Sequence, residues 1–311
     1  MTAMNSLDQG GDFSSEETTP DQPEKLAEEV AEAVLDGNLG DSLYRAQFVA
    51  WFRAVAPYVH AFRHKIFVVA VSGEAVAAGR LARVCEDLAL LRALGIRIVV
   101  VHGSRPQMEE QLRLRNVESR FHNDLRITDH AALECAKEAN GEIRLDIEAA
   151  FSQGLANTPM ANADIKVMSG NFITARPLGV IDGVDFQHTG VVRKVSAEVI
   201  ELALNARAVV LFSPLGFSPT GEAFNLDMED VASSVAAAVH AEKLIFLTGA
   251  PGLVDADGAL IRELSEEAAV GNATTNITQP RHIRNRHRIG GQPRGPSNSA
   301  SGLAQFVSAD V

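Results

Sequence analysis

The sequence predicts an α/β fold, in which a mainly parallel sheet is sandwiched between helices. Short apolar runs at 66–71, 96–101, 208–212 and 243–247 have the length of strands. They are continuously apolar rather than alternating, which is typical of strands that are buried on both faces. Stretches with helical spacing separate them, and this order of strands and helices favours a parallel sheet with covering helices.

The first elements along the chain are two helices around a strand. Phe48, Phe52, Val55 and Val59 recur at helical spacing and predict an amphipathic helix over 44–62. Strand 66–71 and then helix 80–94 follow, the latter with one apolar face. The remaining expected elements are strand 96–101, helices 106–115 and 129–152, hairpins over 164–195, helix 196–206, strand 208–212, helix 229–241, strand 243–247 and a short hairpin at 255–260.

Composition divides the chain into three parts. Residues 1–41 are polar and acidic, with Lys25 as their only basic side chain apart from histidine, so we expect disorder there. Residues 42–269 are rich in Leu, Val and Ala and form the expected folded domain. Residues 270–311 hold five Arg, no Lys and many Gly, Pro, Asn and Ser. We expect this low-complexity tail to be disordered too.

Charge and cysteine content restrict the function. The net charge of −12 argues against a general nucleic-acid or acidic-membrane partner. No stretch approaches 18 uninterrupted apolar residues and no signal peptide is visible, so neither a membrane span nor secretion is expected. Cys85 and Cys135 form no metal-type spacing. We expect a reducing, cytoplasmic location.

Glycine turns follow the first two strands. Ser72-Gly73 ends the first run, and Gly103-Ser104 follows the second in "VVVHGSRPQM". Ligands in parallel α/β sheets collect at the carboxyl ends of strands, and small residues there let a ligand approach backbone N–H groups. Each turn taken alone is equally consistent with a tight turn that binds nothing.

The motif "LRITD" leaves two readings open. Asp129 can cap the helix that follows it. Arg126 is then either a clamp for a ligand carboxylate or a partner for Asp129.

In their order and spacing, "VVVHGSRPQ", "RITD", "SGNFITARPLGV" and the "SPLG…FNL…AEKLI" block resemble the amino-acid kinase fold. Within that fold they look closest to the N-terminal domain of bacterial N-acetylglutamate synthases. The resemblance covers about residues 48–269. It implies that Ser72, Gly73, Gly103 and Ser104 belong to vestigial substrate and nucleotide loops, together with Arg126, Asn225 and Glu229.

The resemblance also addresses catalysis. Acetylglutamate kinases carry a phosphate-binding lysine on the first strand, and Ala70 stands at that position. Glu229 stands where the kinases place a catalysis-organising Asp, after the matching Asn225. Phosphoryl transfer depends on positioned positive charge, which alanine cannot supply. We therefore expect a catalytically silent kinase fold with no catalytic residue of its own.

The resemblance implies that, in the synthase family, the silent domain senses L-arginine and builds a homo-oligomer. A separate domain transfers acetyl from acetyl-CoA to glutamate, and this chain does not match that domain, so we expect no cofactor here. Lys243 would meet the arginine carboxylate, and Tyr58 matches the N-terminal helix of the family's effector site. The acidic loop that holds the guanidinium would follow residue 270 and is missing. Arginine binding is therefore expected to be weakened or lost.

Several alternatives remain. Lys243 could only flank a strand and Tyr58 could only pack. His102 and His188 have no partners at metal-ligand spacing, so no metal site is expected. For the whole chain, the alternatives are an ATP-dependent acetylglutamate kinase and a standalone regulatory or scaffolding subunit. A frameshift, a truncation and a genuine variant would each account for the unusual tail.

Overall fold

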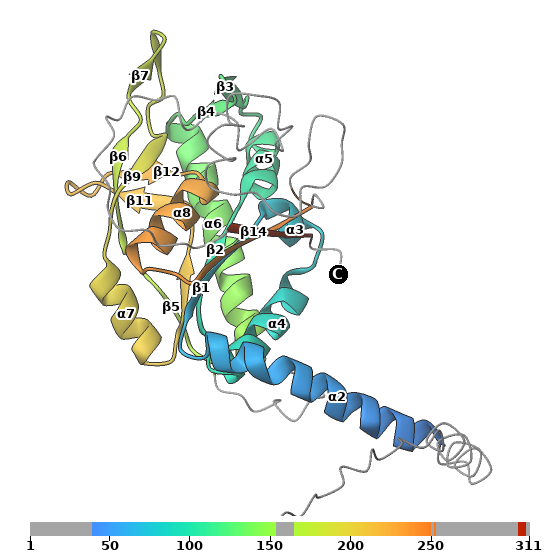
Figure 1. The fold of residues 1–311 in the computed structure, drawn as a ribbon. Coiled ribbons are helices and arrows are strands. Elements are labelled where there is room, and N and C mark those ends of the chain that lie inside the picture. The colour runs from blue at the N-terminus through green and yellow to red at the C-terminus, as the bar shows by residue number, and fades with distance from the viewer. Residues whose placement is uncertain (1–38, 154–164, 250–251, 253–303, 309–311) are drawn as a thin grey trace, which may run out of the picture. The chain divides into compact units, whose positions relative to one another are not determined.

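The computed structural model describes residues 39–153, 165–249, 252 and 304–308 (Figure 1). The chain forms two units, residues 1–61 and 62–311. The helices are α2 (Leu39–Phe62), α3 (Gly73–Ala77), α4 (Leu81–Ala93), α5 (Arg105–Leu114), α6 (His130–Ser152), α7 (Ala197–Asn205) and α8 (Met228–Ala238).

The main sheet has six strands in the order β14-β13-β1-β2-β10-β5, and every neighbouring pair is parallel. The expected parallel α/β sheet is thus confirmed. Its strands are β1 (Ile66–Val71), β2 (Arg97–His102), β5 (Val167–Ser169), β10 (Val209–Phe212), β13 (Lys243–Thr248) and β14 (Ala304–Ser308).

Alternate residues of the central strands pack on opposite faces of this sheet. Val68 and Ala70 of β1 belong to one apolar cluster, which α7, α8 and a second sheet complete. Phe67 and Val69 belong to the other, which α4 and α6 complete. Successive side chains in a strand point to opposite faces, so two covered faces require a continuously apolar strand. All six residues of β1 are accordingly buried.

A smaller four-stranded sheet has the order β12-β11-β6-β9. Its strands are β6 (Ile173–Pro177), β9 (Gly190–Val195), β11 (Leu215–Phe217) and β12 (Ala223–Asn225). Two separate hairpins accompany this sheet. One joins β3 (Arg120–His122) with β4 (Leu125–Ile127), and the other joins β7 (Val180–Ile181) with β8 (Val184–Asp185). The hairpins expected over 164–195 are therefore only partly right. Residues Val167–Ser169 form β5 and pair with β10 in the main sheet. A three-residue strand gives too short a pattern to identify its partner.

The two ends of the chain differ from expectation in small segments. Helix α2 begins at Leu39, inside the segment 1–41 that was expected to be disordered. Residues Ala304–Ser308 of the expected disordered tail form β14, which pairs with β13. The remainder of both segments, and the hairpin expected at 255–260, lie outside the described residues. In the part of the chain that is described, no helix is both long and apolar enough to cross a membrane.

Candidate functional site

The loops after β1 and β2 touch at the carboxyl edge of the main sheet. The N–H of Gly103 donates to the carbonyl of Val71 at 2.7 Å. A Cβ on Gly103 would lie 2.8 Å from the nitrogen of Gly73, and one on Gly73 would lie 2.7 Å from Cδ of Pro106. No real Cβ tolerates such contacts, so glycine is needed at both positions. The immediate reason is the packing of the two loops on each other.

Serines begin the helices that follow these loops. The hydroxyl of Ser72 accepts a hydrogen bond from the N–H of Ala75 at 3.2 Å and caps α3. Ser104 holds the same position before α5, but its side chain makes no capping bond. It is only 6% exposed. The amino end of α5 and the largely buried Ser104 therefore lie together beside the two glycines.

A cavity of about 390 Å³ opens at this edge of the sheet. Its wall contains all seven of the predicted loop residues, which are Ser72, Gly73, Gly103, Ser104, Arg126, Asn225 and Glu229. They come from segments up to 157 positions apart in the chain, since Ser72 and Glu229 both take part. The topology thus brings every predicted loop residue to one place. Lys243 and Tyr58 are not in the wall.

Arg126 does not pair with Asp129, which was one of the two readings left open for it. Its guanidinium pairs with the carboxylate of Glu109, donates to the Ser119 hydroxyl at 3.1 Å and lies 4.6 Å from the centre of the Phe121 ring. Asp129 pairs instead with Arg120 at 2.9 Å. The sequence interpretation of an Arg126–Asp129 pair is therefore wrong. Arg126 and Asp129 are close in the sequence, but each side chain forms its ion pair with a residue of a different element.

Asp129 does cap α6 as expected. Its Oδ1 accepts from the N–H of Ala132 at 2.9 Å. Behind the cap, the amide of Asn225 donates to the hydroxyl of Thr128 at 3.2 Å, and the Thr189 hydroxyl donates to the same oxygen at 2.9 Å. This polar chain fixes one wall of the cavity to the start of α6.

Two carboxyl groups meet at the start of α8. Asp227 caps the helix, since its Oδ1 accepts from the N–H of Glu229 at 3.0 Å. Burial raises the pKa of Glu229 to about 9. A hydrogen bond accepted by the Asp227 carboxylate and the negative charge of that carboxylate raise it further. Glu229 is therefore protonated and neutral at pH 7. Asp227 did not emerge from the sequence, although its position two residues before Glu229 at a helix start is a capping signal.

Ala70 is fully buried in the apolar cluster on the α8 side of the sheet. Among the described residues, the cavity wall contains the arginines Arg105, Arg126 and Arg176 and no lysine. The position at which kinases place their phosphate-binding lysine thus contributes only packing. Arg105 and Arg176 lie inside the motifs "VVVHGSRPQ" and "SGNFITARPLGV", but they were not predicted as site residues.

His102 is completely buried beside the second loop. Its Nε2 lies 2.8 Å from the Ser213 hydroxyl and its Nδ1 lies 3.3 Å from the carbonyl of Gly103. Burial lowers the pKa of this imidazole to about 4. The hydrogen bond with the Gly103 carbonyl acts in the opposite direction, but its effect on the pKa is smaller. His102 is neutral at physiological pH and orders the loop after β10.

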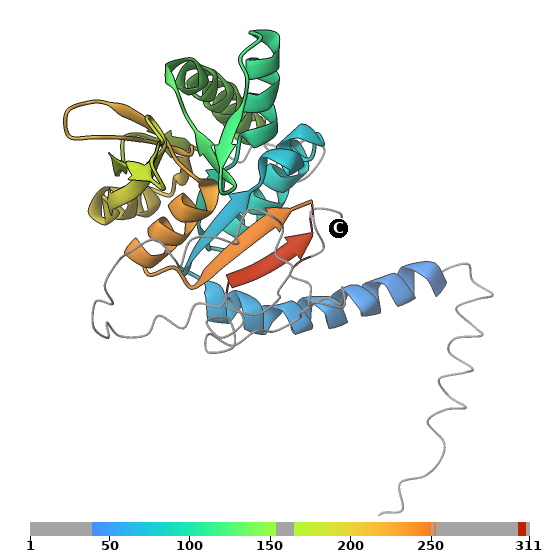
Figure 2. The same cartoon turned by 90° about the horizontal axis from the view of Figure 1, so that it is seen from above.

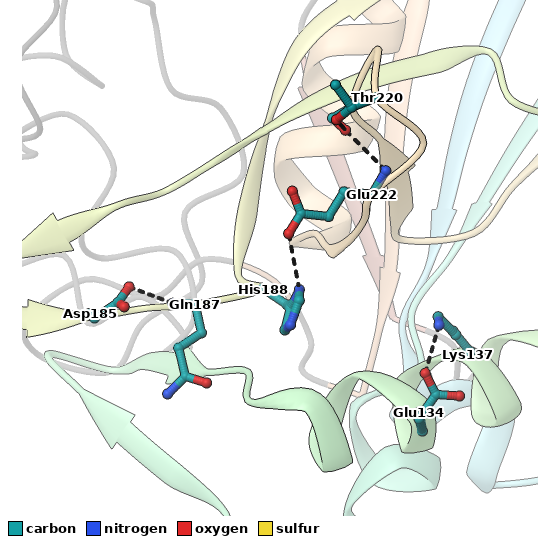
Figure 3. Close-up of polar contacts among 8 residues, drawn as sticks. Glu134, Lys137, Asp185, Gln187, His188, Thr220 and Glu222 are labelled. Carbon is teal, nitrogen blue, oxygen red and sulfur yellow. Dashed lines mark hydrogen bonds and ion pairs between the residues drawn. The ribbon is translucent and has the colours of Figure 1, made fainter.

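His188 lies on the outer side of the same region. In Figure 3 its ring points toward the carboxylate of Glu222, with a distance of 3.8 Å between Nδ1 and Oε1. The same view shows the ion pair of Glu134 with Lys137 at 2.6 Å. Within the described residues, no three His, Cys, Asp or Glu side chains gather as a metal site would require.

The two residues proposed for an effector lie elsewhere. Lys243 is the first residue of β13 and pairs in register with Phe67 near the start of β1. It is therefore at the amino edge of the sheet, opposite the cavity, and its Nζ lies 4.8 Å from the centre of the Phe62 ring. Tyr58 belongs to α2, and its side chain is 66% exposed.

Comparison with known proteins identifies relatives of one kind. The chain is 62% identical over 224 residues to an amino-acid acetyltransferase of Ralstonia nicotianae, a match that covers 72% of this chain and 50% of that protein. It is 49% identical over 217 residues to an amino-acid acetyltransferase of Azotobacter vinelandii, covering 70% of this chain and 50% of that protein. The chain thus spans about half the length of the curated relatives it matches.

Among solved structures, N-acetylglutamate synthase from Neisseria gonorrhoeae, crystallised with coenzyme A and L-arginine, superposes with a TM-score of 0.71. The two are 33% identical, and the match covers 84% of this chain and 60% of that one. The resemblance to N-acetylglutamate synthases seen in the sequence is borne out by these relatives.

The amino acid kinase family matches residues 65–278, which is more than half of the chain. The matched range contains five of the six strands of the main sheet, the helices that cover them and the cavity at the carboxyl edge. This chain is a member of the amino acid kinase family.

Proposed function

We propose that this chain is the kinase-like, arginine-sensing domain of an N-acetylglutamate synthase, and that the domain itself catalyses no phosphoryl transfer. The observation that carries the proposal is a cavity at the carboxyl edge of the sheet whose described wall residues include no lysine, together with Ala70 buried in the core of β1. A cavity of this kind without the phosphate-binding lysine suits regulation better than phosphoryl transfer.

The activity of the whole protein would be the transfer of acetyl from acetyl-CoA to L-glutamate, in the cytoplasm, as the first step toward arginine. The names of the relatives support this class of reaction. The standalone regulatory subunit is the second candidate. It would co-purify with a separate acetyltransferase, whereas the synthase reading requires acetyl transfer by a chain that carries both domains.

Arginine provides the direct test of the sensing role. We expect the present chain to bind L-arginine roughly ten- to hundredfold more weakly than the Neisseria gonorrhoeae synthase does. The sequence from residue 270 departs from the family pattern that supplies an acidic partner for the guanidinium, and a charge-assisted pair contributes about 1.5–3 kcal/mol. Titration calorimetry of both proteins measures this ratio.

Lys243 should carry part of the remaining affinity. In calorimetry, Lys243→Ala is expected to remove the residual arginine signal, because the ammonium group would meet the effector carboxylate. Lys137→Ala serves as the matched control, since Lys137 is an exposed lysine paired with Glu134. Tight arginine binding by the present chain, or unchanged binding by Lys243→Ala, would place the effector site elsewhere.

Self-association through α2 is the second part of the proposal. Phe48, Trp51, Phe52 and Tyr58 are each more than half exposed on this helix, at 53, 61, 61 and 66%. The rings of Phe48, Trp51 and Phe52 form one cluster with centroids 6.3 Å apart. Such a patch is more apolar surface than a monomer usually exposes.

A variant that begins at Lys65 should therefore form a smaller assembly than the full chain. Light scattering at matched concentrations gives the two masses. Equal association states for both proteins would remove α2 from the interface.

A further inference from the structure

The two sides of the main sheet end in different ways. On one side the last strand is β5, which has only three residues, and Met168 at its centre is 41% exposed. Toward the other side lies β13, which has six residues, and the four from Leu244 to Leu247 are all apolar. Natural edge strands are kept short or are interrupted by charge, proline or a bulge, because an open edge pairs with other chains. β5 has the features of an edge strand, whereas β13 does not.

β13 has the packing of an interior strand. Leu244 and Phe246 pack on the apolar cluster on the α8 side of the sheet, whereas Ile245 and Leu247 pack on the cluster on the α4 side. β1 pairs with one edge of β13 in parallel over five residue pairs. Backbone N–H and C=O groups point alternately to the two sides of a strand, so pairing with β1 alone would leave every second residue of β13 without a partner strand. The packing of β13 therefore indicates that its second edge needs a strand as well.

The strand on that second edge comes from near the end of the chain. β14 pairs with β13 in parallel over five residue pairs, of which the last is Thr248 with Ser308. Figure 2 shows β14 lying along β13 at the edge of the sheet. The sequence of this segment suits the position, because residues 295–309 carry no charged side chain and Phe306 is the single aromatic residue after residue 270. Phe and Val are strong strand formers, unlike the residues rich in Arg, Pro and Gly that precede them.

We propose that the second edge of β13 is a strand-docking surface, and that residues 304–308 of the same chain are its occupant. The surface takes an extended, uncharged segment with apolar residues, in parallel and in one register. The tail that composition marks as low-complexity thus holds a short segment that completes the domain. This inference depends neither on arginine sensing nor on the cavity at the carboxyl edge of the sheet.

Paired cysteines test the register in the full chain. Neighbouring strands lie about 4.8 Å apart, which is within the Cα separation of about 4.4–6.8 Å that a disulfide spans. The double variant Thr248→Cys/Ser308→Cys places two thiols at one register pair, and mild oxidation should join them within most chains. Thr248→Cys/Ala304→Cys is the matched control, because its two positions are offset by roughly 13 Å along the strands and should stay reduced. The buried Cys85 and Cys135 are the same in both variants.

Two shortened chains test whether the edge of β13 needs an occupant. A chain that ends at residue 303 should unfold at a temperature lower by about 4–8 °C, because several backbone hydrogen bonds are lost. Amide exchange along β13 should also become at least about tenfold faster, since its edge opens to water. A chain that ends at residue 308 keeps β14 and should match the full chain in both measurements.

Synthetic peptides test the docking surface directly. A peptide of residues 301–311 should restore the unfolding temperature and the exchange protection of the chain that ends at residue 303, because it binds the folded form. Two further peptides carry an N-methyl group on the backbone amide of either Gln305 or Phe306, which removes one donor and keeps every side chain. Because N–H groups alternate in direction along a strand, one of these peptides should bind like the parent and the other at least about tenfold more weakly.

Three results would overturn the proposal. They are crosslinking of the control pair as efficient as that of the in-register pair, equal unfolding and exchange for the two shortened chains, and equal binding of the two methylated peptides. A disulfide that joins two different chains through Thr248→Cys and Ser308→Cys would assign the edge to a second copy and would likewise contradict the proposal. If the chain that ends at residue 303 does not fold, the cysteine pairs in the full chain still decide the question.

Discussion

An assay of ADP release with MgATP and N-acetyl-L-glutamate is expected to show no turnover by this chain. Ordinary kinases turn over at about 1 per second or faster. Loss of one group that stabilises the charge of a transition state reduces rates by about 10²–10³, and the phosphate-binding lysine is such a group. Ala70 occupies its position on β1 and is fully buried.

Two neighbouring cations, Arg126 and Lys243, do not replace that lysine. Arg126 is already paired with Glu109 and stacked on Phe121. Lys243 stands at the amino edge of the sheet, away from the cavity. The carboxyl that would organise a catalytic lysine, Glu229, is itself protonated at neutral pH because burial raises its pKa. An acetylglutamate kinase measured in parallel validates the assay, and turnover near 1 per second by this chain would restore the kinase alternative.

Acid is expected to destabilise the folded chain through His102. The pKa of this imidazole is about 4 when folded, against 6.5 as the ordinary value. Below pH 6.5 the His102 imidazole of the unfolded chain binds a proton that the folded chain excludes. The stability that depends on a neutral His102 is therefore fully present above pH 6.5 and is lost as the pH falls toward 4. At pH 4.5 the loss amounts to about 2–3 kcal/mol in the free energy of unfolding.

Urea unfolding at pH 7 and pH 4.5 measures this contribution. His102→Gln should shrink the difference between the two pH values by about 2–3 kcal/mol relative to the parent chain. The variant loses the contact with Ser213 and is also expected to be less stable at pH 7. His60→Gln changes an exposed histidine and should leave the difference unaltered. An equal pH response in the parent and His102→Gln would show that the imidazole does not drive the acid effect.

The sequence was most informative where a pattern depends on nearby residues. The apolar run at 66–71 corresponds to β1 at the same bounds, and the helix expected over 129–152 corresponds to α6 from His130 to Ser152. The periodicity of apolar side chains and the capping of helices are local properties, since both depend on residues a few positions apart in the sequence. Residues Val167–Ser169 were misassigned because a short strand is defined by its partner, and that partner, β10, lies far along the chain.

For the candidate site, the sequence determined which segments would meet. Glycine turns at the ends of β1 and β2 must lie at one edge of a parallel sheet, so Gly73 and Gly103 could be placed together without coordinates. Family motifs added Asn225 and Glu229 to the same edge. The absence of a lysine at Ala70, and with it the expectation of a silent kinase fold, was also readable from the sequence alone.

The tertiary structure decided which side chains pair across those segments. It paired Arg126 with Glu109 rather than Asp129, let Asp227 cap α8 at the N–H of Glu229, and placed the largely buried Ser104 in the cavity wall. Sequence spacing fixes neither the direction of a side chain nor its burial, and both the protonation of Glu229 and the neutrality of His102 follow from burial. The charge that this cavity presents to a ligand is therefore a property of the packed fold, because desolvation and contact between distant residues set it.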